Sequence, residues 1–154
     1  MEYEQLKLEN QLCFPFYAVS RLIIRAYQED LDALELTYPQ YLVLMVLWEN
    51  DNVSVNTIAE KLILNTNTIT PLLKRMEVSG LIIRHQSDED QRKVIVSLTA
   101  KGTDLKVLAA EIPFRLMKKL KIEPQEEQIQ EALILKKKLY ELINLLKTLK
   151  YNKL

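Results

Sequence analysis

Hydrophobic residues recur at helical spacing in two short segments near the middle of the chain. The apolar positions of the first segment are Ile58, Ala59 and Leu62, and those of the second are Ile69, Leu72, Leu73 and Met76. Residues at i, i+3, i+4 and i+7 share one face of an α-helix, so each segment predicts a short helix with one buried side. The helix that carries Ile69 to Met76 is called the second helix of the pair.

Two runs of β-forming residues follow the second helix of the pair, at positions 81–85 and 94–98. Gly80 precedes the first run, where it can end the helix in a left-handed cap. The segment between the runs, residues 86–93, is too polar to be buried and too long for a tight hairpin, so we expect it to protrude as a wing. Two helices followed by such a hairpin predict a winged helix-turn-helix.

Similar patterns predict helices on both sides of this module. We expect a long first helix over about residues 12–34, then a helix that is apolar on almost every side, and after Gly102 a helix that Pro113 kinks or breaks. The sequence thus predicts a single domain over residues 1–154 that is mostly α-helical with a small β-hairpin wing (α+β).

The final helix, which we expect to open at Pro124, carries more apolar surface than a lone helix on a small domain needs. Leu135 and Leu145, for example, lie off its main apolar stripe. The helix either packs on its own core or pairs with a helix of another chain, and the pattern favours a partner.

The charge balance leaves room for a local basic patch. The formal net charge is zero, with 21 basic and 21 acidic residues, which argues against a long basic tail. Cations nevertheless gather in the module, at Lys74, Arg75, Arg84, Arg92, Lys93 and Lys101. A patch of this kind is compatible with nucleic-acid binding.

Other classes of protein find little support. The longest apolar run, Tyr41 to Trp48, is far shorter than the ~18 residues that a membrane helix needs, and no apolar stretch typical of a signal peptide follows Met1. With one histidine and one cysteine we expect no metal site and no cofactor, and no catalytic motif indicates an enzyme. We expect a cytoplasmic protein without membrane partners.

The second helix of the pair has a face, opposite its buried side, that suits the major groove of DNA, so it is called the recognition helix from here on. This surface and its flanks consist of Thr66, Asn67, Thr68, Thr70, Pro71, Lys74 and Arg75. Hydroxyls, an amide and cations are the groups that read base edges and contact phosphates. Pro71 lacks an N–H group, which a helix tolerates only near its start.

Arg92 in the wing follows an acidic tip formed by Asp88, Glu89 and Asp90. The residues alone leave two roles open for it. Arg92 either satisfies Asp90 at the surface or enters the minor groove of DNA, where narrow A·T-rich sequences attract a guanidinium group.

Cys13 is the only cysteine, which excludes an intramolecular disulfide and a zinc site built on a cysteine pair. A lone cysteine is most often a small buried hydrophobe. Pro15, however, predicts that a helix starts nearby, and the positive end of a helix dipole favours the reactive thiolate.

Four sequence blocks resemble the MarR family of bacterial transcriptional regulators, in particular its OhrR branch of organic hydroperoxide sensors with one cysteine. In chain order the blocks are LENQLCFPFY (8–17), LTYPQYLVLMVLWE (36–49), TITPLLKRMEVSGLIIR (68–84) and DEDQRKVIVSLTAKG (88–102). The C-terminal third matches only in its helical character. The resemblance implies a winged helix-turn-helix module over about residues 36–102, with dimerisation helices over about residues 8–34 and 103–150.

The resemblance also implies partners. MarR-like proteins are homodimers, and two-fold symmetry lets two recognition helices reach the half-sites of a pseudo-palindromic operator in double-stranded DNA. In the family's D-x-R motif, here Asp90-Gln91-Arg92, the acid braces the wing while the arginine enters the minor groove. Asn67 stands where the family pattern has a glycine, so we expect a different base preference.

For Cys13 the resemblance implies redox sensing. Tyr27 and Tyr38 follow it by 14 and 25 residues, the offsets at which OhrR-like proteins place tyrosines whose hydroxyls bond the reactive sulfur of the partner subunit. An organic hydroperoxide would convert Cys13 to a sulfenic acid, which would then form a mixed disulfide with a low-molecular-weight thiol or with another chain. Either product would release DNA. Pro15 departs from the family pattern. The implied function is a repressor that responds to oxidative stress.

Two alternatives remain open from the sequence. One keeps the DNA-binding dimer but leaves Cys13 inert, with a small aromatic ligand as effector in a pocket between the dimer helices and the winged module. The other is a protein-interaction module that has lost DNA binding, for which the acidic wing tip is the best support.

Overall fold

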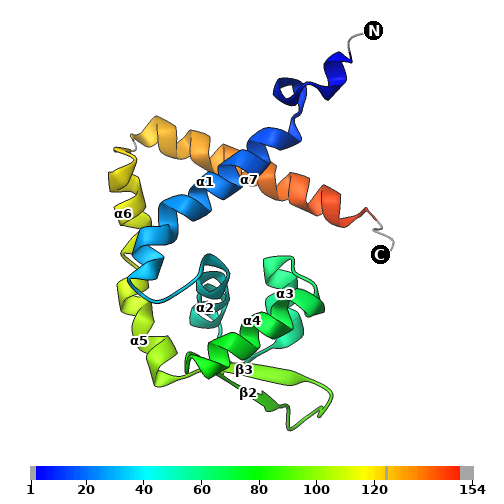
Figure 1. The fold of residues 1–154 in the computed structure, drawn as a ribbon, viewed down its shortest axis with the longest axis vertical. Coiled ribbons are helices and arrows are strands. Elements are labelled where there is room, and N and C mark those ends of the chain that lie inside the picture. Colours follow the sequence, from blue (N-terminus) through cyan, green and yellow to red (C-terminus); the bar gives the residue numbers. More distant parts are fainter. Residues whose placement is uncertain (1–2, 124, 150–154) are drawn as a thin grey trace. The chain divides into compact units, whose positions relative to one another are not determined.

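The computed structural model describes residues 3–123 and 125–149 of the chain. The chain divides into two compact units, residues 1–116 and 117–154. The first unit holds the sheet and most of the helices, and the second holds one long helix (Figure 1). This mostly α architecture with a small antiparallel sheet confirms the predicted fold class.

Two helices precede the two-helix segment that the sequence predicts. Helix α1, Cys13–Asp32, begins close to Pro15 as expected, after two short 3-10 turns at Glu4–Leu6 and Leu8–Asn10. Helix α2, Tyr38–Glu49, is capped by Thr37, whose N–H donates to Gln40 Oε1 at 2.8 Å. The residues that α2 buries are Gln40, Tyr41, Val43, Leu44, Val46 and Leu47. They lie on several sides of α2, which confirms its central position in the core.

Helices α3, Val55–Leu62, and α4, Thr66–Val78, pack on each other and form the predicted pair. Each has a side-chain cap at its start: Ser54 Oγ accepts from Thr57 N at 3.0 Å, and Asn65 Oδ1 accepts from Thr68 N at 2.9 Å. The predicted buried face of α4 is confirmed, because Ile69, Leu72, Leu73 and Met76 are all buried. That of α3 is confirmed at Ile58 and Ala59, whereas Leu62 is only half-buried. Helix α4 is the recognition helix.

Three strands form the sheet, in the order β1-β3-β2 and with both neighbouring pairs antiparallel. The hairpin consists of β2, Ile82–Gln86, and β3, Val94–Leu98, close to the predicted runs. Strand β1, Val53–Ser54, was not predicted. It has only two residues, too few for an alternating pattern, and exists only through its pairing with β3.

Both glycines of the chain hold the hairpin in place. Gly80 follows α4 with a φ of 70°, the left-handed conformation expected of a helix-ending glycine. Gly102 lies in the next helix, and a Cβ atom there would overlap the backbone oxygen of Leu81. The start of that helix can approach the root of β2 only because residue 102 has no side chain.

The chain after the hairpin is helical but interrupted. Helix α5, Ala100–Ala109, ends before α6, Ile112–Lys119, which confirms that the chain breaks next to Pro113. Asp30 of α1 is buried and forms an ion pair with Arg115 of α6 at 3.5 Å. This pair ties the end of α1 to the start of α6 within the first unit.

The second unit contains α7, Glu126–Lys147, and no residue of this helix is buried. Pro124, the predicted opening residue, lies outside the described residues, and Gln125 is the N-cap. Among residues 3–123 and 125–149, no helix is both long enough and apolar enough to cross a membrane.

Candidate nucleic-acid interface and redox site

The outward face of α4 presents most of the predicted DNA-reading residues to solvent. Thr66, Asn67, Thr68, Pro71, Lys74 and Arg75 are exposed, and Thr70 is half-buried. Because the buried side of α4 packs on the core, the helix face that carries these side chains is fixed in direction and remains uncovered. Pro71 is the sixth residue of α4 and cannot donate to the carbonyl of Asn67, so this oxygen lacks its helical bond.

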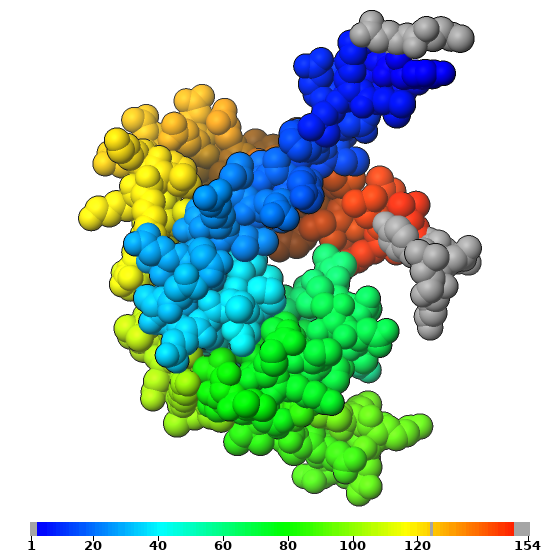
Figure 2. Space-filling view, viewed as in Figure 1, coloured from blue at the N-terminus to red at the C-terminus, as the bar shows by residue number. Residues whose placement is uncertain are grey.

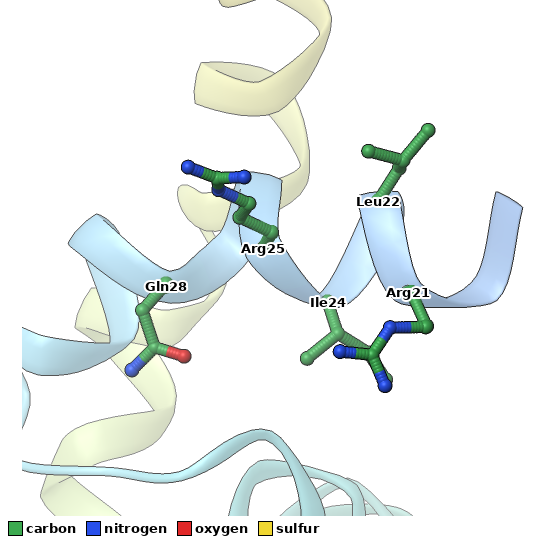
Figure 3. Close-up of a pocket in the computed structure, with 5 residues that line it drawn as sticks. All are labelled: Arg21, Leu22, Ile24, Arg25 and Gln28. Atoms are coloured by element: carbon green, nitrogen blue, oxygen red, sulfur yellow. The ribbon is translucent and has the colours of Figure 1, made fainter. Parts of the chain in front are cut away.

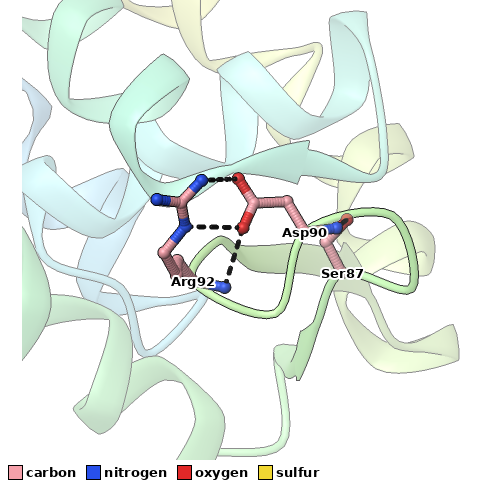
Figure 4. Close-up of polar contacts among 3 residues, drawn as sticks. All are labelled: Ser87, Asp90 and Arg92. Carbon is pink, nitrogen blue, oxygen red and sulfur yellow. Dashed lines mark hydrogen bonds and ion pairs between the residues drawn. The ribbon is translucent and has the colours of Figure 1, made fainter.

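The wing is ordered by its own polar contacts, with Asp90 at their centre (Figure 4). Asp90 Oδ1 accepts from the backbone N–H of Arg92 at 3.1 Å and from Arg92 Nε at 3.0 Å. Arg92 Nη2 donates to Asp90 Oδ2 at 3.4 Å, and Ser87 Oγ accepts from Asp90 N at 3.4 Å. The acid therefore braces both the loop and the arginine.

The pairing leaves the guanidinium of Arg92 accessible. Its side chain is 91% exposed, whereas that of Asp90 is 26% exposed, and the wing projects beyond the body of the first unit (Figure 2). Hydrogen bonds from Arg92 hold the pKa of Asp90 below its usual value, so Asp90 stays ionised. Asp90 and Arg92 thus form a fixed surface pair whose cationic end faces solvent.

A second ion pair, between Arg84 of β2 and Glu77 of α4, joins the wing to the recognition helix. Arg84 Nη2 lies 2.6 Å from Glu77 Oε2, and the Arg84 N–H donates to Glu77 Oε1 at 3.0 Å. The hydrogen bond from Arg84 lowers the pKa of Glu77. Sequence reasoning missed this pair because a separation of seven residues between a helix and a strand has no pattern of its own.

A hollow of about 220 Å³ lies where the start of α3, the recognition helix and the wing meet. It is lined by Ser54, Val55, Asn56, Thr66, Thr70, Arg84, Arg92, Lys93 and Val94. The hollow has the chemistry of an anion-binding site, because three cationic side chains and several small polar groups line it close to the N-terminal ends of α3 and α4. Ser54 and Asn56 were not predicted to take part. Their only sequence signal is that they begin a helix beside a basic segment.

Cys13 is the first residue of α1 and is exposed in the single chain. Tyr27 lies on the same helix, 14 residues on, which places it ~21 Å away along the axis at 1.5 Å per residue. The two side chains of one chain therefore cannot meet. Any contact of the Cys13 sulfur with Tyr27 needs a second chain.

Tyr27 and Tyr38 come together with two further aromatic residues. Their rings meet edge-on with centroids 5.5 Å apart, and Tyr41 lies 6.1 Å from Tyr27 and 6.3 Å from Tyr38. Trp48 contacts Tyr41 at 6.2 Å. Burial raises the pKa of Tyr27, Tyr38 and Tyr41, so their hydroxyls remain protonated and able to donate hydrogen bonds.

Two other hollows lie in the first unit. One, of about 410 Å³, follows α1 and is lined by Arg21, Leu22, Ile24, Arg25 and Gln28. Figure 3 shows the Arg21 and Arg25 side chains pointing to different sides, so they do not converge on one anion. The other, of about 290 Å³, lies between α2 and the α5–α6 segment and is mostly apolar. No group of acidic, histidine or cysteine side chains among the described residues could hold a metal ion.

The fold and these surfaces define the class of a winged-helix transcriptional regulator, and comparison with known proteins specifies the family. Residues 25–107 match the family model "Transcriptional regulator SarA/Rot". The chain is 50% identical over 112 residues to the organic hydroperoxide resistance transcriptional regulator of Bacillus subtilis, which covers 73% of this chain and 76% of that protein. It is 33% identical to the regulator SarZ of Staphylococcus saprophyticus over 94% of this chain and 95% of that one.

Among solved structures, AbfR of Staphylococcus epidermidis is similar in both sequence and fold. Reduced AbfR bound to DNA matches with 37% identity and a TM-score of 0.76, over 95% of this chain and 99% of AbfR, and AbfR has also been solved in a disulfide form. The chain belongs to the SarA/Rot-type regulators of the MarR family and is an OhrR-like member of it.

Proposed function

We propose that this regulator is a homodimeric repressor that binds a pseudo-palindromic DNA operator and releases it when an organic hydroperoxide oxidises Cys13. The observation that carries the proposal is the placement of the only cysteine, exposed at the first residue of α1, in a chain whose winged module presents a ready DNA-reading surface. Two relatives support it: the B. subtilis relative is an organic hydroperoxide resistance regulator, and AbfR has been solved in its reduced form bound to DNA. Such a repressor acts in the cytoplasm, where the chromosome lies.

Each part of the module has a distinct role in this proposal. The outward face of α4, from Thr66 to Arg75, reads base edges in the major groove, and Arg92 enters the adjacent minor groove. The hollow beside Lys93 seats a phosphate of the DNA backbone between the two reading elements. Asp90 contributes by holding the wing and Arg92 in place.

Dimerisation is supported by large apolar side chains that stay exposed among residues 3–123 and 125–149. Leu12, just before α1, is 77% exposed, and Leu133 and Leu145 of α7 are 52% and 63% exposed. Soluble proteins seldom leave so many large apolar side chains open unless a partner covers them. Residues 8–34 and 103–150 therefore supply the dimer contacts, and residues 36–102 supply the DNA-binding module.

The chemistry needs one peroxide and one thiol per cysteine. The Cys13 thiolate attacks the terminal oxygen of the hydroperoxide, the O–O bond breaks, and the leaving alkoxide takes a proton to become an alcohol. A low-molecular-weight thiol then attacks the sulfenic sulfur, and water leaves as the mixed disulfide forms. Tyr27 and Tyr38 of the partner subunit donate hydrogen bonds to the thiolate before the reaction, and the bulkier product displaces them.

A titration of operator DNA tests this proposal. The wild-type protein should lose affinity after treatment with an organic hydroperoxide and a small thiol, by a factor within the range of about 5 to 150 that allosteric coupling usually spans, and a reductant should restore it. Cys13→Ser should bind DNA normally and ignore the oxidant. Tyr27→Phe and Tyr38→Phe should bind DNA but react several-fold more slowly, because they stabilise the thiolate less.

Two outcomes would contradict the proposal. Release of DNA from Cys13→Ser by the same oxidant would exclude sensing at Cys13. Failure of the reduced wild-type protein to bind its own upstream region would favour a protein-interaction module instead. A matched control is Ser20→Cys in the Cys13→Ser background, which places an exposed thiol elsewhere on α1 and should not restore the response.

One observation favours a second candidate in which Cys13 is inert and a small aromatic ligand is the effector. The hollow between α2 and α5–α6 is lined by Tyr41, Met45, Trp48, Glu49, Lys106, Ala109, Ala110 and Pro113. Aromatic walls and a lysine suit a flat ligand with a carboxylate. Release of DNA by such a compound, unchanged in Cys13→Ser and lost in Ala110→Phe, where the wall residue is exposed, would support this candidate over redox sensing.

A further inference from the structure

Trp48 is the only tryptophan of the chain, and it contacts both Tyr41 of α2 and Gly102 of α5. On one side its ring meets Tyr41 edge-on, with centroids 6.2 Å apart. On the other side its indole N–H donates to the backbone oxygen of Gly102 at 2.9 Å. Fifty-four residues separate Trp48 from Gly102, so this bond joins the aromatic cluster of α1 and α2 to the start of α5.

The start of α5 is in turn hydrogen-bonded to the end of the recognition helix and to the residues just before β2. Thr99 Oγ1 donates to the Gly80 oxygen at 2.6 Å, Thr99 N donates to the Leu81 oxygen at 3.2 Å, and Lys101 Nζ donates to the Ser79 oxygen at 3.1 Å. Gly102 packs directly on Leu81. A displacement of Gly102 is therefore passed to both DNA-reading elements.

On its other side, Trp48 is connected through Tyr41 to Tyr27 and Tyr38, the two tyrosines proposed to bond the Cys13 sulfur of the partner subunit. Tyr41 is within 6.3 Å of both Tyr27 and Tyr38, measured between ring centroids, and it is buried. In a close-packed cluster, a shift of one ring forces its neighbours to repack. Tyr41 is thus the only ring that contacts both the tyrosine pair and Trp48 in the contacts among the described residues.

Trp48 also has room to adopt a second position. It is half-buried, and its side chain borders the hollow of about 290 Å³ between α2 and α5–α6. The opposite wall of this hollow is formed by Ala109, Ala110 and Pro113, which leave space for a large ring. The hollow therefore offers the indole a second position beside the one in which it bonds Gly102. Two available arrangements are what a switch requires.

We propose that Trp48 is the positioning residue that transmits the state of the tyrosine pair to the recognition helix and the wing. This inference rests on the proposed function. While Tyr27 and Tyr38 hold the partner's thiolate, Trp48 stays bonded to Gly102 and α5 holds the DNA-reading elements in register. When the mixed disulfide displaces the tyrosines, Tyr41 shifts and Trp48 moves into the hollow. The hydrogen bond from Trp48 to Gly102 then breaks, and α5 no longer fixes the positions of the recognition helix and the wing.

The first experiment uses the wild-type protein, because its single tryptophan reports on this position without any substitution. Treatment with an organic hydroperoxide and a small thiol should change the emission maximum and the quenching by acrylamide, in step with DNA release. Cys13→Ser should show neither change. DNA release from the wild-type protein with constant Trp48 emission and quenching would overturn the inference while leaving the proposed function intact.

The second experiment replaces the donor. Trp48→Phe keeps an aromatic ring beside Tyr41 but cannot bond Gly102, and reduced Trp48→Phe should bind DNA within about five-fold of wild type, the value of one net hydrogen bond. Oxidation should lower wild-type affinity by about 5- to 150-fold and that of Trp48→Phe by less than about three-fold. Met45→Leu, which lines the same hollow, should respond like wild type.

The outcomes separate the two proposals. Equal oxidative release from Trp48→Phe and wild type would overturn the role of Trp48, whereas absence of release from the wild-type protein would overturn redox sensing itself. If circular dichroism shows that Trp48→Phe does not fold, 3-benzothienylalanine at this position keeps the shape of the indole and removes only the N–H group, so the same comparison can be made.

Discussion

The recognition helix α4 and the C-terminal helix α7 both carry apolar residues at regular intervals, but their surroundings differ. Helix α4 buries four of these residues, and Ile69, Leu73 and Met76 are completely inaccessible. Helix α7 is longer, with 22 residues, and buries none. The DNA-reading surface therefore rests on a core within its own unit, whereas α7 has no buried residue, as expected of a helix that pairs across a dimer. Folding of the module and assembly of the dimer can be perturbed separately.

The largest effect should follow from placing charges on α7. Leu133→Glu combined with Leu146→Glu should give a monomer, and DNA affinity should fall at least ~100-fold because the two half-sites are no longer bound together. Sedimentation velocity and a DNA titration measure the two effects. Lys136→Glu, at an exposed position that is already polar, should remain dimeric. A doubly substituted protein that still sediments as a dimer would place the interface elsewhere.

The converse substitution affects the core of the module. Leu73→Ala should destabilise the protein by about 2–5 kcal/mol, since it leaves a cavity where no solvent reaches. Val78→Ala in the same helix, where the side chain is 89% exposed, should change stability by no more than about 0.5 kcal/mol. Urea denaturation measures both. Similar losses for the two variants would show that burial in the single chain is a poor guide to stability here.

A smaller effect is expected in the wing, which belongs to the module but lies outside its core. Arg92→Ala should weaken operator binding by about 1–3 kcal/mol and leave dimerisation and thermal unfolding nearly unchanged. Arg92→Lys keeps the charge but loses the two-pronged contact with Asp90, so it should recover the salt dependence of binding and only part of the affinity. Unaltered affinity of Arg92→Ala at fixed salt would reduce Arg92 to a surface ion pair.

The smallest effect concerns the titration of Asp90. Since Arg92 lowers the pKa of Asp90, the carboxylate and its brace persist as the pH falls past the ordinary value of 3.8, and they are lost only when the pH falls through the lower value of the folded protein. Arg92→Gln should return this pKa toward its ordinary value. Carboxyl NMR titration of both proteins checks the difference, and identical titration curves would mean that the pair does not form in solution.

Periodicity was sufficient to predict the elements whose shape is set by local sequence. The buried face of α4, the left-handed Gly80 and the break beside Pro113 all follow from spacing or from the conformational limits of one residue. Strand β1 could not be predicted, because a two-residue strand exists only through its partner.

The site could be predicted only where its parts are close together in sequence. The Asp90–Arg92 brace spans two residues and was expected, as was the outward face of α4. The Glu77–Arg84 pair and the bond from Trp48 to Gly102 join separate elements, and no spacing in the sequence indicates them. The roles of Cys13, Tyr27 and Tyr38 remain predictions, since one chain alone cannot bring the sulfur to Tyr27.

The isolated, exposed Cys13 has a practical consequence for spectroscopy. A methanethiosulfonate spin label would attach at one position per chain without engineering, and a two-fold dimer would then give a single distance between labels. Such a label is joined through a disulfide, the same linkage as in the proposed oxidised product. A labelled protein would therefore be a permanent analogue of the released state, and distances measured with it would describe the dimer after DNA release. A label on a second position, in Cys13→Ser, would be required to measure the DNA-bound form.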